Sequence, residues 1–316
     1  MKSLAGLLCA LALLMPAPAA LAQVAPQSAA KGEEPEIVVE ARLAGAPMWE
    51  VTRGDSKILL VGEIVDVPKL TPWRPERLEN VTRRAQSIIL ETKLRVSVGD
   101  IFRIMFNAGK ITRFPKGTTA ADYLSPSQLQ RLIALEQEYG KSYQNRSFLL
   151  TAHGLLNQRL KFSKDTMKDA TDIVRKAAQQ AGIPVRPVGE VRGKELIDSL
   201  FTASPRTQVA CLETAMAAVE AGPGVVAARG EAWTRFDIPA VMASPLEIAL
   251  GSCWPWTDVR FGPELRGLWT TEIGRALTQK GVTLAVVPMR VLAEDGGMLD
   301  QLAAQHFEIK GPAWRK

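Results

Sequence analysis

The sequence predicts an α/β (α+β) fold, in which a mixed, largely buried sheet is flanked by helices and carries a large helical insertion. Two apolar runs, at 58–61 and 282–288, lack the alternation of a half-exposed strand, so both strands are expected to be covered on each face. Helical patterns separate the strands, as in a sheet with helices packed against it. From Val98 to about Gly222 the pattern is mostly helical, and this stretch is the predicted insertion.

Local signals set the individual elements. Arg53-Gly54-Asp55 is a hairpin signal, and Ser125-Pro126-Ser127-Gln128 is a capping box with proline at the first helical position. The expected strands cover 48–52, 57–61, 87–90, 183–188, 282–288 and 307–310. The expected helices outside the insertion cover 75–86, 233–242, 264–277 and 296–305.

The first residues have the composition of a secretory signal peptide. Lys2 gives a basic start, 4–15 an apolar core, and Ala20-Leu21-Ala22 a small-residue cleavage site. Since a spanning helix needs about 20 apolar residues, this core is too short to cross a membrane. The expected product is cleaved after Ala22, exported to the periplasm or secreted, and without a membrane span. The expected organisation is a signal peptide at 1–22, a flexible leader at 23–45 and a folded domain at 46–311.

Composition gives the broad class of the protein. The chain of 316 residues is 47% hydrophobic and 23% charged, which is typical of a globular protein and excludes disorder for most of it. Its net charge of +6 is spread along the sequence and indicates solubility first. Anionic glycans or lipid headgroups stay open as partners, whereas nucleic acid is not expected.

Two cysteines, Cys211 and Cys253, belong to the expected mature chain. An exported compartment permits a disulfide between them. The geometry that a disulfide needs cannot be inferred from sequence, so a bridge and free thiols both remain open.

Several short motifs occur in an order that points to a known family. They include Pro47 to Val51, Leu60-Val61-Gly62, Ile88 to Glu91, Val188-Gly189-Glu190 and Glu231-Ala232-Trp233. Each motif is weak alone, but together they resemble the TraB/GumN family, which is related to the Tiki-type metalloproteases. The resemblance extends over about 46–311.

The resemblance implies a metal-dependent hydrolytic site that this chain has lost. The family carries two Gly-x-x-His motifs, each just past a strand, and a glutamate after another strand; imidazole and carboxylate together suit a divalent ion that activates water. Here the first motif keeps Gly62 but has Val65 in place of histidine, and the second has Arg290 in place of histidine. Glu91 matches the glutamate. We therefore expect no resident metal or other cofactor.

Arg290 is the most informative of these substitutions. A guanidinium stays protonated and cannot bind a cation. We expect it to pair with Glu91, and with Glu63 as a second partner, because an unpaired buried carboxylate costs several kcal/mol. The alternative for Glu63 and Asp66 is that both are solvated loop charges, and for Glu91 that it is a structural carboxylate.

The two histidines, His153 and His306, do not follow apolar strands. We interpret both as surface or helix-end residues. A site built from Glu63, Asp66 and Glu91 stays open as a way to hold a hard ion such as Mg²⁺ or Ca²⁺ through oxygen.

Three functional hypotheses follow. The first is a non-catalytic, binding or regulatory protein that takes a peptide, glycan or protein ligand in the cleft of the lost site. The second is an active metal-dependent hydrolase with a carboxylate site at Glu91. The third is a scaffold whose residues Phe102, Met105 and Phe106 bind a partner, although core packing is the simpler interpretation of that stripe.

Overall fold

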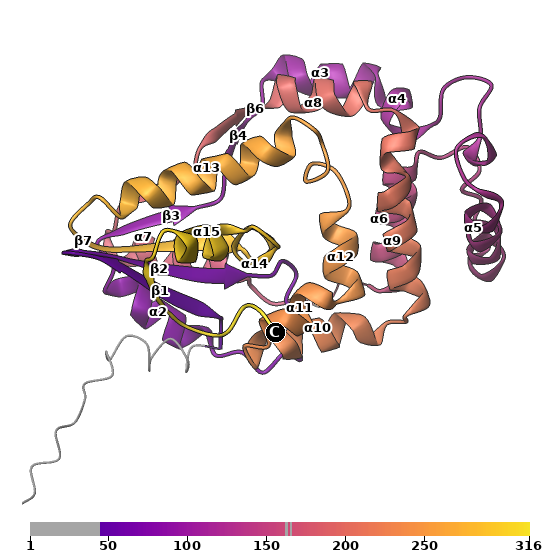
Figure 1. The fold of residues 1–316 in the computed structure, drawn as a ribbon. Coiled ribbons are helices and arrows are strands. Elements are labelled where there is room, and N and C mark those ends of the chain that lie inside the picture. Colours follow the sequence, from indigo (N-terminus) through magenta and orange to yellow (C-terminus); the bar gives the residue numbers. More distant parts are fainter. Residues whose placement is uncertain (1–44, 162–163, 165) are drawn as a thin grey trace, which may run out of the picture. The chain divides into compact units, whose positions relative to one another are not determined.

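The computed structural model describes residues 45–161, 164 and 166–316. The predicted signal peptide and leader, apart from Gly45, lie outside the described residues. Eight strands form a six-stranded sheet in the order β5-β3-β7-β2-β1-β8 and a two-stranded sheet of β4 and β6 (Figure 1). Their bounds are β1 Met48–Arg53, β2 Ser56–Glu63, β3 Ser87–Leu90, β4 Lys93–Arg95, β5 Val185–Pro187, β6 Glu190–Arg192, β7 Gly281–Pro288 and β8 Glu308–Lys310.

The centre of the large sheet is parallel and its far edge is antiparallel. Strand β7 lies between β2 and β3 and runs parallel to both, while β1 pairs antiparallel with β2 and with β8. Glu63 at the end of β2 is in register with Pro288 at the end of β7. The carboxyl ends of β2, β7 and β3 therefore meet at one edge, where α/β proteins usually bind ligands.

Helices cover both faces of this sheet. Helix α2 (Pro75–Arg83) connects β2 to β3, and α7 (Ala170–Ala181) connects β3 to β5. Because both crossovers are between parallel strands and run in the same direction along the sheet, their shared hand places α2 and α7 on the same face, where they pack together. Helices α13 (Phe261–Ala276) and α15 (Met298–Ala304) lie on the opposite face (Figure 1).

The buried strands supply the main core, as their unbroken apolar runs predict. Ile58, Leu60, Ile88 and Val287 are fully buried between the helical layers. The predicted mixed sheet with flanking helices is confirmed.

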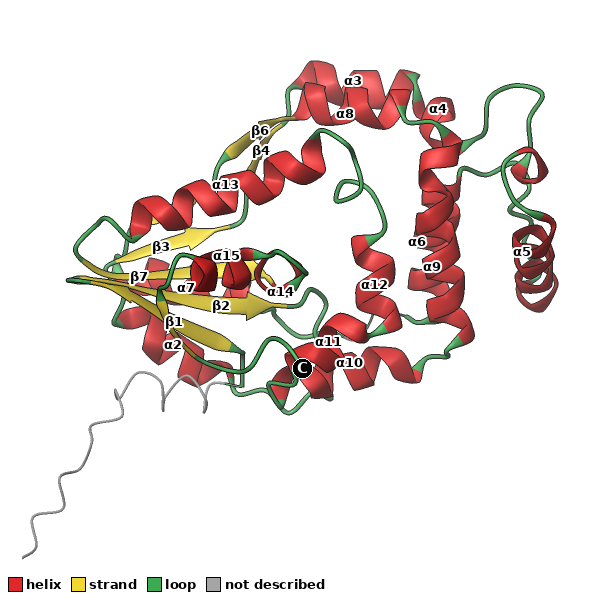
Figure 2. Cartoon of the chain, viewed as in Figure 1, coloured by secondary structure: helices red, strands yellow, loops and turns green. Residues whose placement is uncertain are grey.

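Apart from α7, which packs on the sheet, the helices from Val98 to Gly251 form the helical insertion, which has a second apolar core. Figure 2 shows that it consists almost entirely of helices and loops. A disulfide joins Cys211 on α9 to Cys253 after α12, which settles the open question about the cysteines in favour of a bridge. The remaining helices are α3 Val98–Phe106, α4 Ala108–Thr112, η1 Ala120–Asp122, α5 Pro126–Tyr139, α6 Phe148–Arg159, α8 Gly193–Thr202, η2 Pro205–Gln208, α9 Val209–Glu220, α10 Gly224–Thr234, α11 Ile238–Ala243, α12 Pro245–Gly251 and α14 Met289–Ala293.

Two predicted elements differ from the structure. The helix expected at 233–242 is two helices, because the chain turns at Phe236, whose φ of 63° is left-handed, and Asp237 then caps α11. The stripe of Phe102, Met105 and Phe106, which we interpreted as core, is exposed to solvent on α3.

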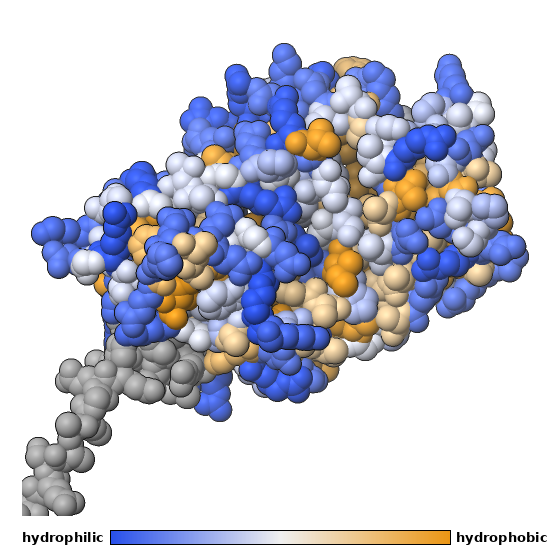
Figure 3. Space-filling model, in the orientation of Figure 1, coloured by the Kyte–Doolittle hydropathy of each residue, from blue (hydrophilic) through white to orange (hydrophobic). Residues whose placement is uncertain are grey.

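The part of the chain that the structure describes contains no single helix long and apolar enough to cross a membrane. One bent pair, 205–220 with 224–234, passes the same test of length and composition across a 93° break. The face in Figure 3 is mostly hydrophilic, with small separate apolar areas.

Candidate functional site

Gly62, near the end of β2, is fixed by close packing. A β-carbon there would lie 2.6 Å from the Met289 side chain and 2.9 Å from the ring of Trp49. The carbonyl of Gly62 also accepts a hydrogen bond of 2.8 Å from the indole of Trp233. A larger residue would have to displace these side chains, so the glycine of the first motif has a structural role here.

Glu63 is held at the N-terminus of α7 and is partly buried. The backbone N–H of Thr171 donates to Glu63 Oε1 at 2.7 Å, and the Thr171 hydroxyl donates to Oε2 at 3.0 Å. Burial first, and then the charge of Asp169, raise the pKa of Glu63 to about 8, although the Thr171 hydrogen bonds act in the opposite direction. The interpretation of Glu63 as a solvated loop charge is therefore wrong.

Asp169 occupies the same helix end as Glu63. It is the N-cap of α7, and its carboxylate accepts a hydrogen bond of 3.0 Å from the backbone N–H of Asp172. Burial raises the pKa of Asp169, and the charges of Asp172 and Glu91 raise it as well. Glu63 and Asp169 thus accept hydrogen bonds from two different backbone N–H groups at the positive end of one helix.

Glu91 follows β3 directly and is half exposed. Its carboxylate accepts a hydrogen bond from Nη2 of Arg175 on α7, and Arg175 Nη1 also lies 3.4 Å from Asp172. The expected ion pair of Glu91 with Arg290 is thus replaced by one with Arg175. The reason is local: Arg175 lies one turn after Thr171 on the helix that packs beside β3.

Arg290 turns the other way, toward the helical insertion. Its guanidinium donates to the carbonyl of Glu247 on α12 and lies 3.7 Å from the Glu247 carboxylate. Gly251 makes room for it, because a β-carbon there would lie 1.7 Å from Arg290 Cζ. The expectation that Arg290 neutralises Glu91 or Glu63 was wrong, since α14 begins at Met289 and directs the side chain to α12.

Arg229 completes this buried network. Its Nε donates to Glu247 at 2.9 Å, and its Nη1 donates to the carbonyl of Val65 at 3.1 Å. Arg229 is 2% exposed and Glu247 is 6% exposed. We call Arg229, Glu247 and Arg290 the Arg–Glu–Arg triad; it ties α10, α12, α14 and the loop after β2 together.

Val65 and Asp66 form the exposed tip of that loop. The Val65 side chain is 47% exposed and carries no group that could bind a metal or a proton. Asp66 has a left-handed φ of 55° and is partly buried. Burial raises its pKa, although the nearby Arg229 acts in the opposite direction.

These residues do not form a metal-binding arrangement. Within 45–161, 164 and 166–316, no group of three or more His, Cys, Asp or Glu side chains is placed to hold a metal ion. Both oxygens of Glu63 already accept hydrogen bonds, and Glu91 has an arginine partner. The donor set of this edge therefore does not fit a divalent cation.

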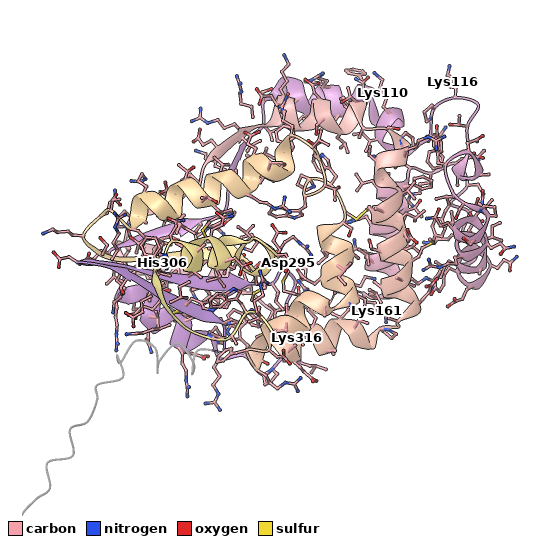
Figure 4. All side chains as sticks on the ribbon, viewed as in Figure 1. Lys110, Lys116, Lys161, Asp295, His306 and Lys316 are labelled. Atoms are coloured by element: carbon pink, nitrogen blue, oxygen red, sulfur yellow. A yellow bond between two sulfur atoms is a disulfide. The ribbon has the colours of Figure 1, made fainter. Side chains whose placement is uncertain are left out.

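The histidines lie elsewhere, as interpreted. His153 is exposed on α6, where its Nε2 lies 2.8 Å from Asn157 Nδ2. His306 is exposed just after α15 with a left-handed φ of 61° (Figure 4). Both are surface or helix-end residues.

Sequence reasoning missed five residues that shape the site. One local signal was available: an aspartate three residues before another acidic residue predicts a helix N-cap at Asp169. The partnerships of the others depend on contacts distant in sequence. The missed residues are Asp169, Thr171, Arg175, Arg229 and Glu247.

Comparison with known proteins gives one match. The model of the TraB/PrgY/gumN family matches residues 47–311 of the chain. No curated protein and no solved structure was found to match.

Proposed function

The chain belongs to the TraB/PrgY/gumN family, and from this premise we propose that it is an exported, non-catalytic member that binds a ligand where β2, β7 and β3 end. The ligand class is a peptide, a glycan or a partner protein. The edge offers an exposed apolar group in Val65, after β2, and the half-exposed ion pair of Glu91 and Arg175, after β3. Such a mixture suits a ligand that contributes both apolar contacts and hydrogen bonds.

The observation that carries this proposal is the position of Arg290. It stands where the resemblance places a metal-binding histidine, and its permanent charge repels a cation. The Arg–Glu–Arg triad holds it in place, with the triad's carboxylate 2.9 Å from Arg229 and 3.7 Å from Arg290. Freeing Arg290 would separate its guanidinium from the Glu247 carboxylate and carbonyl, its partners on α12, so the substitution is built into the fold.

The remaining acidic groups support the same proposal. Glu63 is engaged by Thr171 and Glu91 by Arg175. Neither carboxylate is grouped with further oxygen or nitrogen ligands that could together hold a metal ion and activate a water molecule.

Export is the part of the proposal that rests on sequence alone. A basic residue, an apolar core and an Ala-Leu-Ala site occupy the first 22 residues. The cysteine pair is compatible with it, because disulfides persist in oxidising compartments. N-terminal sequencing of the protein recovered from outside the cytoplasm tests this part, with Gln23 as the expected first residue.

A second candidate, a hydrolase with a carboxylate-only site, is favoured by one observation. The pKa of Glu63 is raised to about 8 by burial and by the charge of Asp169, with a smaller contribution from Glu91. Groups that titrate near neutral pH are common among general acids and bases. In this candidate Glu63 would exchange a proton with a bound ligand.

Metal retention and Glu91→Ala separate the two candidates. The mature chain is incubated with Zn²⁺, Mg²⁺ or Mn²⁺, dialysed, and analysed for bound metal and for peptide hydrolysis. The proposal expects less metal than protein and no hydrolysis. Stoichiometric metal together with a hydrolysis that Glu91→Ala abolishes, while Glu190→Ala on β6 leaves it intact, would establish the hydrolase.

A further inference from the structure

Helix α3 presents its apolar face to solvent. Its large apolar residues recur at the spacing of a single helical stripe, which normally faces a protein core. Here that stripe is exposed, from 51% at Phe102 to 80% at Phe106. The stripe consists of Val98, Ile101, Phe102, Met105 and Phe106.

The polar side of α3 faces the protein instead. Asp100 is buried and closes a capping box with Ser97. Arg103 pairs with Asp198 on α8, which packs beside α3. The helix is thus turned with its polar side inward and its apolar side outward, and the residues that the structure describes leave this apolar side uncovered.

The exposed apolar area continues beyond the helix. Leu94 on β4 and Val96 after it are 49% and 47% exposed. We call these two residues and the α3 stripe the α3 apolar surface. Its exposed side chains include Phe102 and Phe106, whose rings stack with their centroids 6.4 Å apart.

Positive charge predominates in the segments that carry this surface or pack beside it. Residues 93–116 and 190–202 together contain eight Lys or Arg and four Asp or Glu, a net charge of +4. At the C-terminal end of α3, a pocket of about 530 Å³ is lined by Phe106 and Phe201 together with Lys110, Arg113 and Lys116. Figure 4 shows Lys110 and Lys116 on the segment that follows α3.

We propose that the α3 apolar surface docks on a membrane that contains anionic phospholipids. Aromatic and aliphatic side chains on one face of a helix, bordered by lysine and arginine, are the features of a helix that lies in the membrane interface. Phe102, Met105 and Phe106 would enter the boundary between headgroups and acyl chains. The pocket with Lys110 and Lys116 would receive a lipid phosphate.

Charge complementarity selects this occupant over a second copy of the chain. A two-fold contact through this surface would bring the same net charge of +4 from each copy together. An anionic bilayer attracts those cations instead, at roughly 1 kcal/mol for each basic residue near the surface. The binding concerns a surface on the helical insertion and does not depend on the ligand proposed for the sheet edge.

Vesicle co-sedimentation tests the proposal with the intact mature chain. The chain is expected to sediment with phosphatidylcholine vesicles that contain phosphatidylglycerol and to remain in solution with phosphatidylcholine alone. The variant Phe102→Ser/Met105→Ser/Phe106→Ser should lose at least about tenfold in affinity. Its control is Leu70→Ser, because Leu70 is 96% exposed between β2 and α2, away from α3, and that control should bind like the parent.

The charge requirement has its own pair of variants. Lys110→Gln/Lys116→Gln should weaken binding about thirtyfold, the effect of removing two surface cations. Lys280→Gln/Lys316→Gln removes the same charge from other exposed positions and should change binding little.

Three results would overturn the proposal. They are equal binding to vesicles with and without phosphatidylglycerol, unchanged binding of the triple serine variant, and a dimer in solution that the triple variant dissociates without any vesicle binding by the parent. Circular dichroism checks that the triple variant is folded, and Met105→Ser alone replaces it if it is not.

Discussion

The Arg–Glu–Arg triad makes Glu247 the most sensitive charged residue of the site region. Glu247→Gln keeps the shape of the side chain but removes the negative charge between two guanidinium groups, Arg229 at 2.9 Å and Arg290 at 3.7 Å. Because Arg229 is 2% exposed, water cannot replace the lost partner. Removing one partner of a buried ion pair costs about 3–5 kcal/mol, a large part of the roughly 5–15 kcal/mol that stabilises a typical domain.

Urea unfolding followed by tryptophan fluorescence measures this cost. The matched control is Glu220→Gln, which breaks the exposed pair of Glu220 with Arg131 at 2.6 Å and should cost no more than about 1 kcal/mol. A loss below about 1 kcal/mol for Glu247→Gln as well would show that the triad is solvated in solution. Arg290 would then not be locked in place by Glu247.

Three further predictions concern single features of the fold. The pKa of Glu63 is raised from 4.5 to about 8, so between these pH values the folded chain holds a proton that the unfolded chain has released. The free energy of unfolding should therefore fall as pH rises through this window, by up to about 1.4 kcal/mol per pH unit. Glu63→Gln should flatten this pH dependence in urea titrations. If the variant keeps the same pH dependence, another group causes it. Cys211→Ala/Cys253→Ala opens a loop with a sequence separation of 42 and should cost about 4 kcal/mol, which unfolding of the parent with and without reductant checks independently. Gly62→Ala should cost about 1–3 kcal/mol of stability, because the new methyl group would contact neighbouring side chains. Gly267→Ala, in an open position on α13, should instead stabilise the chain by about 0.5–1 kcal/mol. Similar effects of the two substitutions on thermal unfolding would refute the packing account of Gly62.

The sheet could be predicted because its signals are local. The apolar run 282–288 nearly coincides with β7, and the Arg-Gly-Asp signal falls at the β1–β2 turn, where Gly54 has a left-handed φ of 55°. Strands β4 and β6 were not predicted, since each has only three residues and their side chains are mostly exposed. Their pairing depends on two segments that are about a hundred residues apart in sequence, and no local pattern encodes it.

The site was only partly predictable for the same reason. The sequence placed Glu63, Glu91 and Arg290 at adjacent strand ends, and the parallel register puts Glu63 opposite Pro288. Which charges pair depends on the direction of each side chain and on helices elsewhere in the chain. Arg175 and Glu247 belong to such helices, and neither has a local feature that identifies it as a partner.

Arg290 connects these observations. A charge at the end of a buried strand needs a counter-charge. The carboxylates of the sheet edge, Glu63 and Glu91, have partners at the N-terminus of α7 and in Arg175. Glu247 lies on the other side, in the helical insertion, and Gly251 leaves space beside it for a guanidinium. The pairing therefore fixes the insertion to the sheet, while Val65 and Glu91 stay exposed at the edge where the family's motifs meet.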